Sequence, residues 1–106
     1  MVSQFDVYWV DLNPTIGAEM QKTRPCVVVS PQELNDHLDT VIIVPVTSAI
    51  HAYPYRVSCR IMEREGEIAT DQIRTIDKRR LKKRITTLSE DEITILQDIL
   101  RQMFCE

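Results

Sequence analysis

Two short apolar runs constrain the fold of this chain more than any other feature. Residues 26–30 and 41–46 are both rich in Val and Ile, and a polar segment separates them. Continuous runs of β-branched residues are typical of strands that are covered on both faces. We therefore predict strands over about 24–30 and 40–47, both of them in a buried sheet.

The remaining strands are predicted from weaker patterns. Apolar and polar residues alternate from Phe5 to Val10, which indicates a half-buried strand that ends near Asp11. The polar stretch over residues 12–23 contains several turn signals, and structureless segments of this length are usually functional or mobile. Further strands are expected near residues 54–61, 67–73 and 84–87.

Three helical segments are expected from their capping residues. Between the two apolar runs, Ser30 is the expected cap of a short helix. Asp77 can cap one helical turn over residues 78–81. Ser89 and Glu92 form a capping box that begins an amphipathic helix, and its apolar side is expected to pack on the sheet. That side consists of Ile93, Leu96, Ile99, Leu100 and Met103.

These elements together predict one domain over residues 1–106. A chain of 106 residues has the size of a single domain. Several short strands, few glycines and one long helix indicate a mainly β fold with a strongly bent antiparallel sheet. The cysteines stand far apart at 26, 59 and 105, so neither a disulfide framework nor a zinc site is supported. Cys26 is expected to be a small core residue.

Two observations argue against a membrane or secreted protein. The longest apolar stretch is far too short to span a bilayer. The first six residues lack the basic start and apolar core of a signal peptide. We therefore expect a cytoplasmic location and no membrane partner.

The charges are distributed unevenly along the chain. The net charge of −3 argues against a protein that coats nucleic acid over its whole surface. Residues 74–84, however, contain seven Lys and Arg against one Asp, whereas residues 89–106 are mostly acidic. A local basic patch is enough to attract a phosphate backbone. The other interpretation of these lysines is a solvated loop beside an acidic helix.

A positive charge and two hydroxyls are expected at the rim of the sheet. Arg24 stands where the long polar stretch meets the first apolar run, and Thr47 and Ser48 follow the second run. A guanidinium can bind two phosphate oxygens at once, and a hydroxyl can donate to another. This combination suits the capture of a phosphate. Two alternatives stay open, namely a structural ion pair for Arg24 and a hydroxyl bonded to the backbone for Thr47.

Four motifs follow one another along the chain. They are Asp11-Leu12-Asn13-Pro14-Thr15 with Gly17, Glu19 and Arg24-Pro25, then Val44-Pro45-Val46-Thr47-Ser48, Tyr53-Pro54-Tyr55, and Asp71-Gln72-Ile73-Arg74-Thr75-Ile76-Asp77. In their order and spacing these motifs resemble the MazF/PemK/Kid family of toxins, over roughly residues 4 to 104. The resemblance implies an SH3-like barrel of the CcdB/PemK type with a C-terminal helix. It also implies a homodimer and an acidic, MazE-like antitoxin as partners.

The activity that the resemblance implies is ribosome-independent, sequence-specific cleavage of single-stranded RNA, with growth arrest as the result. Cleavage without a metal or cofactor requires the 2′-hydroxyl to attack its own phosphate, leaving a 2′,3′-cyclic phosphate and a 5′-hydroxyl. Such a reaction needs a base, an acid and cations near the phosphate. Arg24, Thr47 and Glu19 are the candidate catalytic residues. Glu19 could accept the 2′-proton or only orient Arg24.

Residues farther along the chain are candidates for binding RNA. Asp71 matches an acid that some family members are thought to use as a base, but Ala69 stands where those members have an arginine. Ala18 and Met20 are two further departures from the family pattern. These departures put an Arg/Asp mechanism in doubt and leave the roles of Arg24 and Thr47 intact. The full set of RNA-binding candidates is Ser48, His51, Asp71, Gln72, Arg74, Lys78 and Arg79.

The aromatic residues and the second histidine allow more than one interpretation. Tyr53 and Tyr55 could stack on RNA bases, pack in the core or contact a partner subunit. Trp9 is expected in the core or an interface, and His37 in solvent. Two alternatives to a nuclease also stay open. The protein could be a CcdB-like toxin that binds gyrase, or an SH3-like module without catalysis.

Overall fold

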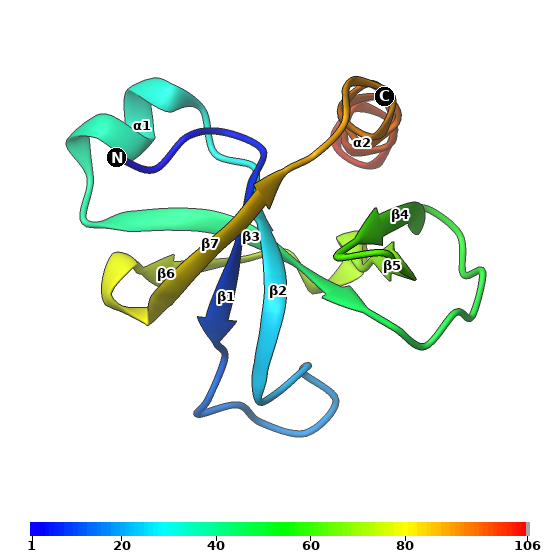
Figure 1. Cartoon of the computed structure of the whole chain (residues 1–106), viewed down its shortest axis with the longest axis horizontal. Helices are drawn as coiled ribbons and strands as arrows, with labels where there is room; N and C mark the ends of the chain where they lie inside the picture. Colours follow the sequence, from blue (N-terminus) through cyan, green and yellow to red (C-terminus); the bar gives the residue numbers. More distant parts are fainter. Residues whose placement is uncertain (106) are drawn as a thin grey trace.

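Seven strands form one curled antiparallel sheet, and the longer of two α-helices packs beside it (Figure 1). The structure is a computed structural model that describes residues 1–105. No helix in this part of the chain is long and apolar enough to cross a membrane. In chain order the elements are β1 (Asp6–Asp11), β2 (Thr23–Val28), α1 (Gln32–His37), β3 (Thr40–Thr47), β4 (Val57–Ile61), β5 (Arg64–Ile68), the 3₁₀ turn η1 (Thr70–Gln72), β6 (Arg74–Asp77), the 3₁₀ turn η2 (Lys78–Arg80), β7 (Leu81–Thr87) and α2 (Glu90–Phe104).

Strand β3 connects the two parts of the sheet. Its first half pairs with β6, its middle with β2, and its last two residues, Val46 and Thr47, pair with β5. The strands therefore follow the order β4-β5-β3-β2-β1-β7, with β6 attached to β3 outside this path. Because β3 pairs with three different strands along its length, the sheet bends along it. The strongly bent antiparallel sheet expected from the sequence is confirmed.

The side chains of β2 and β3 enter two cores, one on each face of the sheet. Val27 and Val44 belong to the core beneath α2, together with the fully buried Leu96 of that helix. Cys26 and Val28, the neighbours of Val27, belong to the other core. Successive residues of a strand point to opposite faces, so apolar runs such as these must be covered twice. The expected burial of both apolar runs, and of Cys26, is confirmed.

The expected helix caps are found at two of the three sites. Ser89 accepts a hydrogen bond from the backbone N–H of Glu92, and the Glu92 carboxylate accepts one from the N–H of Ser89. Asp77 caps η2 by accepting from the N–H of Arg79 at 2.8 Å. Ser30 does not cap α1, and this expectation was wrong. Its hydroxyl bonds to the side chain of Asn35 and accepts from the backbone of β3 instead.

The strand expected near residues 67–73 was also wrong, because this segment turns in its middle. Strand β5 ends at Ile68, and residues 70–72 form η1 before β6 begins. The Thr70 side chain is buried here, and its hydroxyl donates to the carbonyl of Tyr55. The N–H of Ala69 donates to the carbonyl of Pro45 at 2.8 Å. These bonds stabilise the turn between β5 and β6, which both pair with β3. Residues 71 and 72 therefore lie in a turn and not in a strand.

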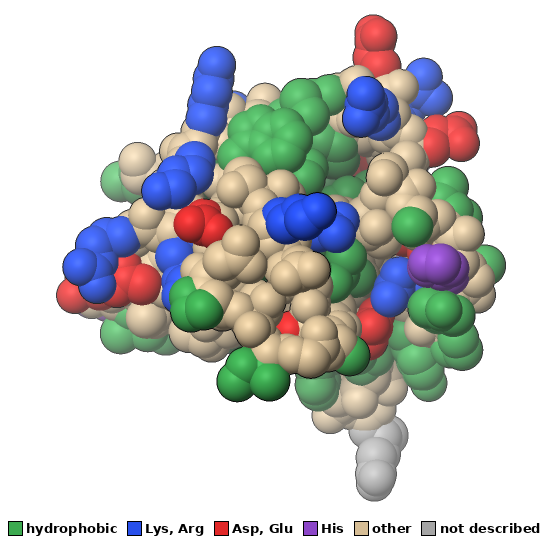
Figure 2. Space-filling model, turned by 90° about the horizontal axis from the view of Figure 1, so that it is seen from below, with side chains coloured by type: hydrophobic (Ala, Val, Ile, Leu, Met, Phe, Trp, Pro, Cys, Tyr) green, Lys and Arg blue, Asp and Glu red, His purple; other side chains and the backbone are tan. Residues whose placement is uncertain are grey.

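Charges of both signs lie on the surface. Seen from below, Lys and Arg side chains are spread over the face, and Asp or Glu side chains lie beside several of them (Figure 2). Five basic residues of the segment 74–84 form ion pairs or bonds to the backbone within the fold. Lys78 donates to the carbonyl of Asn35, Arg79 pairs with Asp77, and Arg84 pairs with Asp6. Arg74 donates to the carbonyl of Leu12, and Arg80 donates to the carbonyls of Asp11 and Asn13.

Candidate active site

Arg24 and Thr47 line the same cavity, which has a volume of about 170 Å³. Cys26 of β2 pairs with Pro45 of the antiparallel β3. Arg24 lies two residues before Cys26, and Thr47 lies two residues after Pro45. Alternate residues of a strand share a face, so the two side chains are expected on one side of the sheet. Ser48 also lines this cavity. The other residues around it are Trp9, Thr23, Pro25, Val46 and residues 61, 62 and 64–66 of the β4–β5 hairpin.

The Arg24 guanidinium has no acidic partner within residues 1–105. No carboxylate oxygen of this part of the chain lies within 4.0 Å of it, which argues against a structural ion pair. Its Nε donates to the carbonyl of Gln21 at 3.0 Å. That bond fixes the base of the guanidinium and leaves both terminal nitrogens available. The arrangement suits an anion in the cavity.

Thr47 is buried at the end of β3 and holds the loop that follows. Its Oγ1 accepts a hydrogen bond from the N–H of Ala49 at 3.1 Å. A hydroxyl has two lone pairs and one proton, so this bond still leaves the proton for a further acceptor. The backbone bond considered for Thr47 therefore exists, and it is compatible with donation to a phosphate oxygen.

Gly66 of β5 allows the hairpin to approach Thr47 closely. A Cβ atom at this position would lie 2.6 Å from the carbonyl oxygen of Thr47. Such a distance is shorter than any van der Waals contact, so another residue would push the strands apart. Glycine at this position therefore allows the β4–β5 hairpin to form the wall of the cavity beside Thr47.

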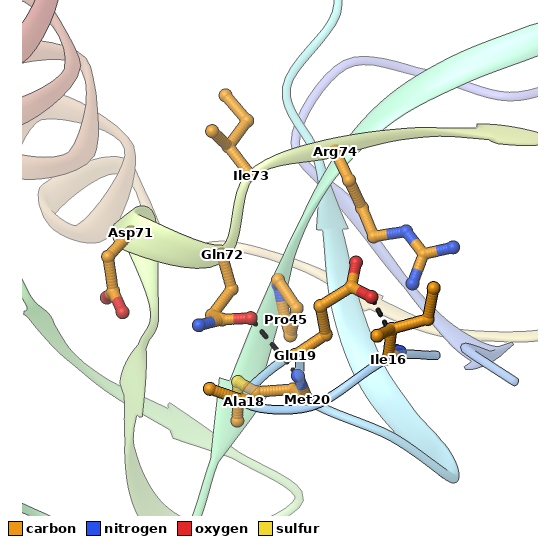
Figure 3. A pocket seen from close by; sticks show the side chains of 9 residues that line it. All are labelled: Ile16, Ala18, Glu19, Met20, Pro45, Asp71, Gln72, Ile73 and Arg74. Atoms are coloured by element: carbon orange, nitrogen blue, oxygen red, sulfur yellow. Dashed lines mark hydrogen bonds between the residues drawn. The ribbon is translucent and has the colours of Figure 1, made fainter. Parts of the chain in front are cut away.

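Figure 3 shows a second cavity, which has a volume of about 330 Å³. Pro45 of β3 lines it, and the next two residues of that strand line the first cavity. Glu19 lines the second cavity and does not contact Arg24. The Glu19 Oε1 accepts from the N–H of Ile16 at 2.7 Å, and the carboxylate lies on the side of Arg74 (Figure 3). The expectation that Glu19 orients Arg24 is therefore not met. The lining residues are Ile16, Ala18, Glu19, Met20, Pro45, Asp71, Gln72, Ile73 and Arg74.

Gln72 and Arg74 fasten the long loop to the wall of this second cavity. The Gln72 Oε1 accepts from the backbone N–H of Met20 at 3.1 Å (Figure 3). The Arg74 Nη1 donates to the carbonyl of Leu12 at 3.2 Å. Each side chain still has N–H groups that these bonds do not use. Both residues can therefore contact a ligand while they hold the loop.

Asp71 has an arginine partner that the sequence did not reveal. Arg56 donates from Nε and Nη2 to the two Asp71 oxygens at 2.7 and 3.1 Å, and its Nη1 reaches Glu67 at 3.4 Å. The hydrogen bonds from Arg56 lower the pKa of Asp71 below its ordinary value of 3.8, although partial burial opposes them. The carboxylates likewise raise the pKa of Arg56. The missing arginine at Ala69 was the one signal that Asp71 needed a cation from elsewhere.

The other RNA-binding candidates line neither of these cavities. The His51 ring stacks on Tyr53, and both side chains are exposed. Lys78 and Arg79 line a separate shallow cavity of about 310 Å³ with Asp39 and Asp77. The structure therefore brings Arg24, Thr47 and Ser48 into one cavity, and Glu19, Asp71, Gln72 and Arg74 into its neighbour. His51, Lys78 and Arg79 belong to neither.

The remaining expectations concern metals and aromatic residues. No group of three or more His, Cys, Asp or Glu within residues 1–105 is placed to hold a metal ion. His37 is exposed, as expected, and its Nδ1 bonds to the carbonyl of Glu33 at 2.7 Å. Trp9 is half-buried and lines the cavity of Arg24, so it is not a core residue. Tyr55 is exposed as well.

Comparisons with known proteins agree on one family. A family model described as PemK-like, MazF-like toxin of type II toxin–antitoxin system matches residues 3–104. An endoribonuclease MazF of Staphylococcus epidermidis is 32% identical, over 94% of this chain and 88% of that protein. A gyrase-binding toxin or a module without catalysis receives no support from these matches.

Solved structures show the same fold. The crystal structure of a MazF of Deinococcus radiodurans superposes with a TM-score of 0.87 at 23% identity, covering 99% of this chain and 97% of that one. An endoribonuclease of a Mycobacterial species, solved in complex with its cognate antitoxin, superposes with a TM-score of 0.81 at 20% identity, covering 96% and 93%. The expected mainly β fold with a C-terminal helix is thereby confirmed.

Proposed function

The chain belongs to the family of PemK-like, MazF-like toxins of type II toxin–antitoxin systems, and on this premise we propose that it cuts single-stranded messenger RNA at a short specific sequence. The observation that carries the proposal is the cavity shared by Arg24 and Thr47. A cation that has no acidic partner among residues 1–105 and a hydroxyl with an unused proton line the same cavity. They can bind the oxygens of one phosphodiester.

The reaction proceeds without a metal by attack of the RNA on itself. The 2′-oxygen forms a bond to phosphorus while the bond from phosphorus to the 5′-oxygen breaks. The 2′-hydroxyl loses its proton to a base, and the departing 5′-oxygen gains one from an acid. The products are a 2′,3′-cyclic phosphate and a 5′-hydroxyl, and charge accumulates on the phosphoryl oxygens between these states.

Arg24 stabilises that charge. Its terminal nitrogens can bind the two non-bridging phosphoryl oxygens, and the Thr47 hydroxyl can donate a further hydrogen bond to one of these oxygens. Donors of this kind contribute roughly 2.7–4 kcal/mol to lowering the barrier. Because a guanidinium does not give up its proton in proteins, we assign Arg24 to charge stabilisation and not to proton donation.

Glu19 is a better candidate base than Asp71. Only one Glu19 oxygen carries a bond in the structure, which leaves the other for a 2′-hydroxyl. Both oxygens of Asp71 accept from Arg56, and its lowered pKa makes it a weaker base. Asp71, Gln72 and Arg74 then serve to bind the nucleotides beside the scissile phosphate, in the second cavity.

Lys78 and Arg79 can contact an acidic partner of the protein. Lys78 and Arg79 lie outside both cavities, where they can bind an RNA backbone or an antitoxin. An acidic antitoxin segment on the basic stretch 74–84 and on the loop 12–23 would compete with RNA by charge. We propose that the active form is a homodimer, which buries apolar surface that a chain this short leaves exposed.

The chemistry of the cut ends tests this proposal. Incubation of the purified protein with a defined RNA should give fragments with 5′-hydroxyl and 2′,3′-cyclic phosphate ends. The 5′ ends should accept phosphate from a polynucleotide kinase without prior phosphatase treatment, and EDTA should leave the rate unchanged. Fragments with 5′-phosphate ends, or a reaction stopped by EDTA, would show that the proposed mechanism is wrong.

A further inference from the structure

The loop between β3 and β4 carries a stack of side chains that the proposed reaction does not use. The His51 ring lies on the Tyr53 ring, with 4.9 Å between their centroids and 12° between their planes. The guanidinium carbon of Arg56 lies 5.0 Å from the centroid of the same Tyr53 ring. Aromatic and guanidinium planes of this kind are the surfaces on which proteins stack unpaired bases.

Glu67 holds the backbone of this loop in place. This buried carboxylate accepts from the N–H of His51 at 3.0 Å and from the N–H of Ala52 at 2.8 Å. Ala52 and Tyr55 have φ angles of 54° and 66°, which cost about 1–2 kcal/mol each in residues other than glycine. Such conformations persist only where the surroundings fix them. The backbone of this loop is therefore held in one conformation.

Arg56 connects the stack to the second cavity. Its side chain is only 8% exposed, and it bonds to Glu67 beneath the loop and to Asp71 at the cavity wall. A buried cation between two carboxylates resists displacement because any movement would leave a charge without a partner. Arg56 thus fixes where the stack lies relative to Asp71.

The stack is exposed and close to the first cavity along the chain. Tyr53 is 54% exposed, and His51 is exposed as well. Ser48 lines the cavity of Arg24, and the three residues from there to His51 span at most about 11 Å. The stack is therefore within reach of an RNA strand that is bound in that cavity.

We propose that His51, supported by Tyr53, is a stacking site for one unpaired base of the RNA, a few nucleotides from the scissile phosphate. Arg56 is its positioning residue. This inference rests on the proposed ribonuclease function and extends it to a second point of substrate recognition. The stack requires an unpaired base, which excludes double-stranded RNA from this site.

An abasic scan of a short RNA tests the site. The substrate is an oligoribonucleotide with one cut site, in which each flanking base is removed in turn. For the wild type, removal of one particular base should raise KM by about 5- to 150-fold, which corresponds to about 1–3 kcal/mol for a stacked base. His51→Ala should raise KM on the intact RNA by a similar factor with little change in kcat, and it should no longer respond to that abasic position.

Conservative and control variants separate stacking from folding. His51→Phe keeps a stacking ring and should retain most of the wild-type KM, whereas His37→Ala, a change at the other exposed histidine, should have no effect. Arg56→Lys should raise KM less than Arg56→Gln does, and Arg56→Gln should also broaden the range of sequences cut. An inactive wild type would refute the ribonuclease function itself. A wild type that cuts while His51→Ala shows an unchanged KM and an unchanged abasic profile would refute only the stacking site.

Discussion

At the scale of single residues, the most informative side chain is Arg56. It gives Asp71 the guanidinium that Ala69 cannot supply, and it reaches Asp71 from fifteen residues away in the sequence. A bidentate pair of this kind keeps the carboxylate ionised and in one orientation. The same pair would hinder Asp71 as a base. The residue that the resemblance marked as a possible catalyst is better explained as an anchor for the cavity wall and the loop beside it.

Asp71→Asn should lower stability in a pH-dependent way. The folded state lowers the pKa of Asp71 below 3.8, so the charged pair stabilises the fold above that pH and loses its effect as the pH falls through the lowered pKa. Half of the Asp71 side chain is exposed, which limits the effect at neutral pH to about 1 kcal/mol or less. Melting temperatures measured by circular dichroism should differ by up to about 4–8 °C at pH 7 and converge as the pH falls through the lowered pKa of Asp71.

A matched change serves as the control for this measurement. Asp98 forms an ion pair of 3.8 Å with Arg101 in which both side chains are well exposed. Asp98→Asn should therefore leave the melting temperature nearly unchanged at all pH values. A difference between wild type and Asp71→Asn that grows toward low pH would contradict the assigned role of the Arg56 pair.

At the scale of elements, the β4–β5 hairpin shapes the candidate active site. Ile61 pairs with Arg64, so Met62 and Glu63 form a two-residue turn, with φ angles of 51° and 61°. Positive φ at both positions is typical of a type I′ turn, which usually contains Asn-Gly or Asp-Gly. This hairpin forms one wall of the cavity of Arg24 and Thr47.

Glu63→Gly should stabilise the protein. Glycine adopts positive φ without the cost of about 1–2 kcal/mol that other residues incur, although it gains more freedom in the unfolded chain. We expect a net gain of about 1 kcal/mol and a melting temperature higher by roughly 4–8 °C. Glu65→Gly, two residues along the same hairpin, is the control. It should destabilise, because Glu65 lies within a strand and is not among the residues with positive φ. A lower melting temperature for Glu63→Gly would rule out strain at this turn.

The elements differ in how far the sequence could predict them. Strands β2 and β3 and the caps of η2 and α2 follow from local patterns, because apolar runs and capping residues act within a few positions. The β4–β5 turn carries no Asn-Gly signal. The turn at η1 depends on a bond from Thr70 to Tyr55, which is fifteen residues away.

The residues of the candidate site also differ in how far the sequence could predict their positions. Arg24 lies at the start of one strong strand pattern and Thr47 at the end of another, and those strands are antiparallel neighbours in the sheet, so their convergence could be expected. The place of Glu19 depends on bonds within the loop and on Gln72, which is 52 residues from Met20. Contacts of this range leave no periodic trace in a sequence. The pairing of Arg56 with Asp71 could not be predicted for the same reason.

At the scale of the whole molecule, strand β3 contributes residues to both cavities of the candidate site. Strand β3 contributes Pro45 to the second cavity and Thr47 to the first, so a single RNA strand can contact both in succession. The sheet is covered on both faces, which keeps this strand rigid beneath the two cavities. We propose that Arg24 and Thr47 act on the same phosphate in the first cavity.

A double-mutant cycle on cleavage rate tests that claim most directly. Single-turnover rates on one defined RNA are measured for wild type, Arg24→Ala, Thr47→Val and the double variant, with Arg60→Ala as a control whose exposed ion pair lies elsewhere. Each single change should slow cleavage by about 10²–10³-fold. The double variant should be slower by much less than the product of the two factors, because both groups act on one phosphate. A wild-type rate in either single variant, or factors that multiply fully in the double variant, would contradict the account.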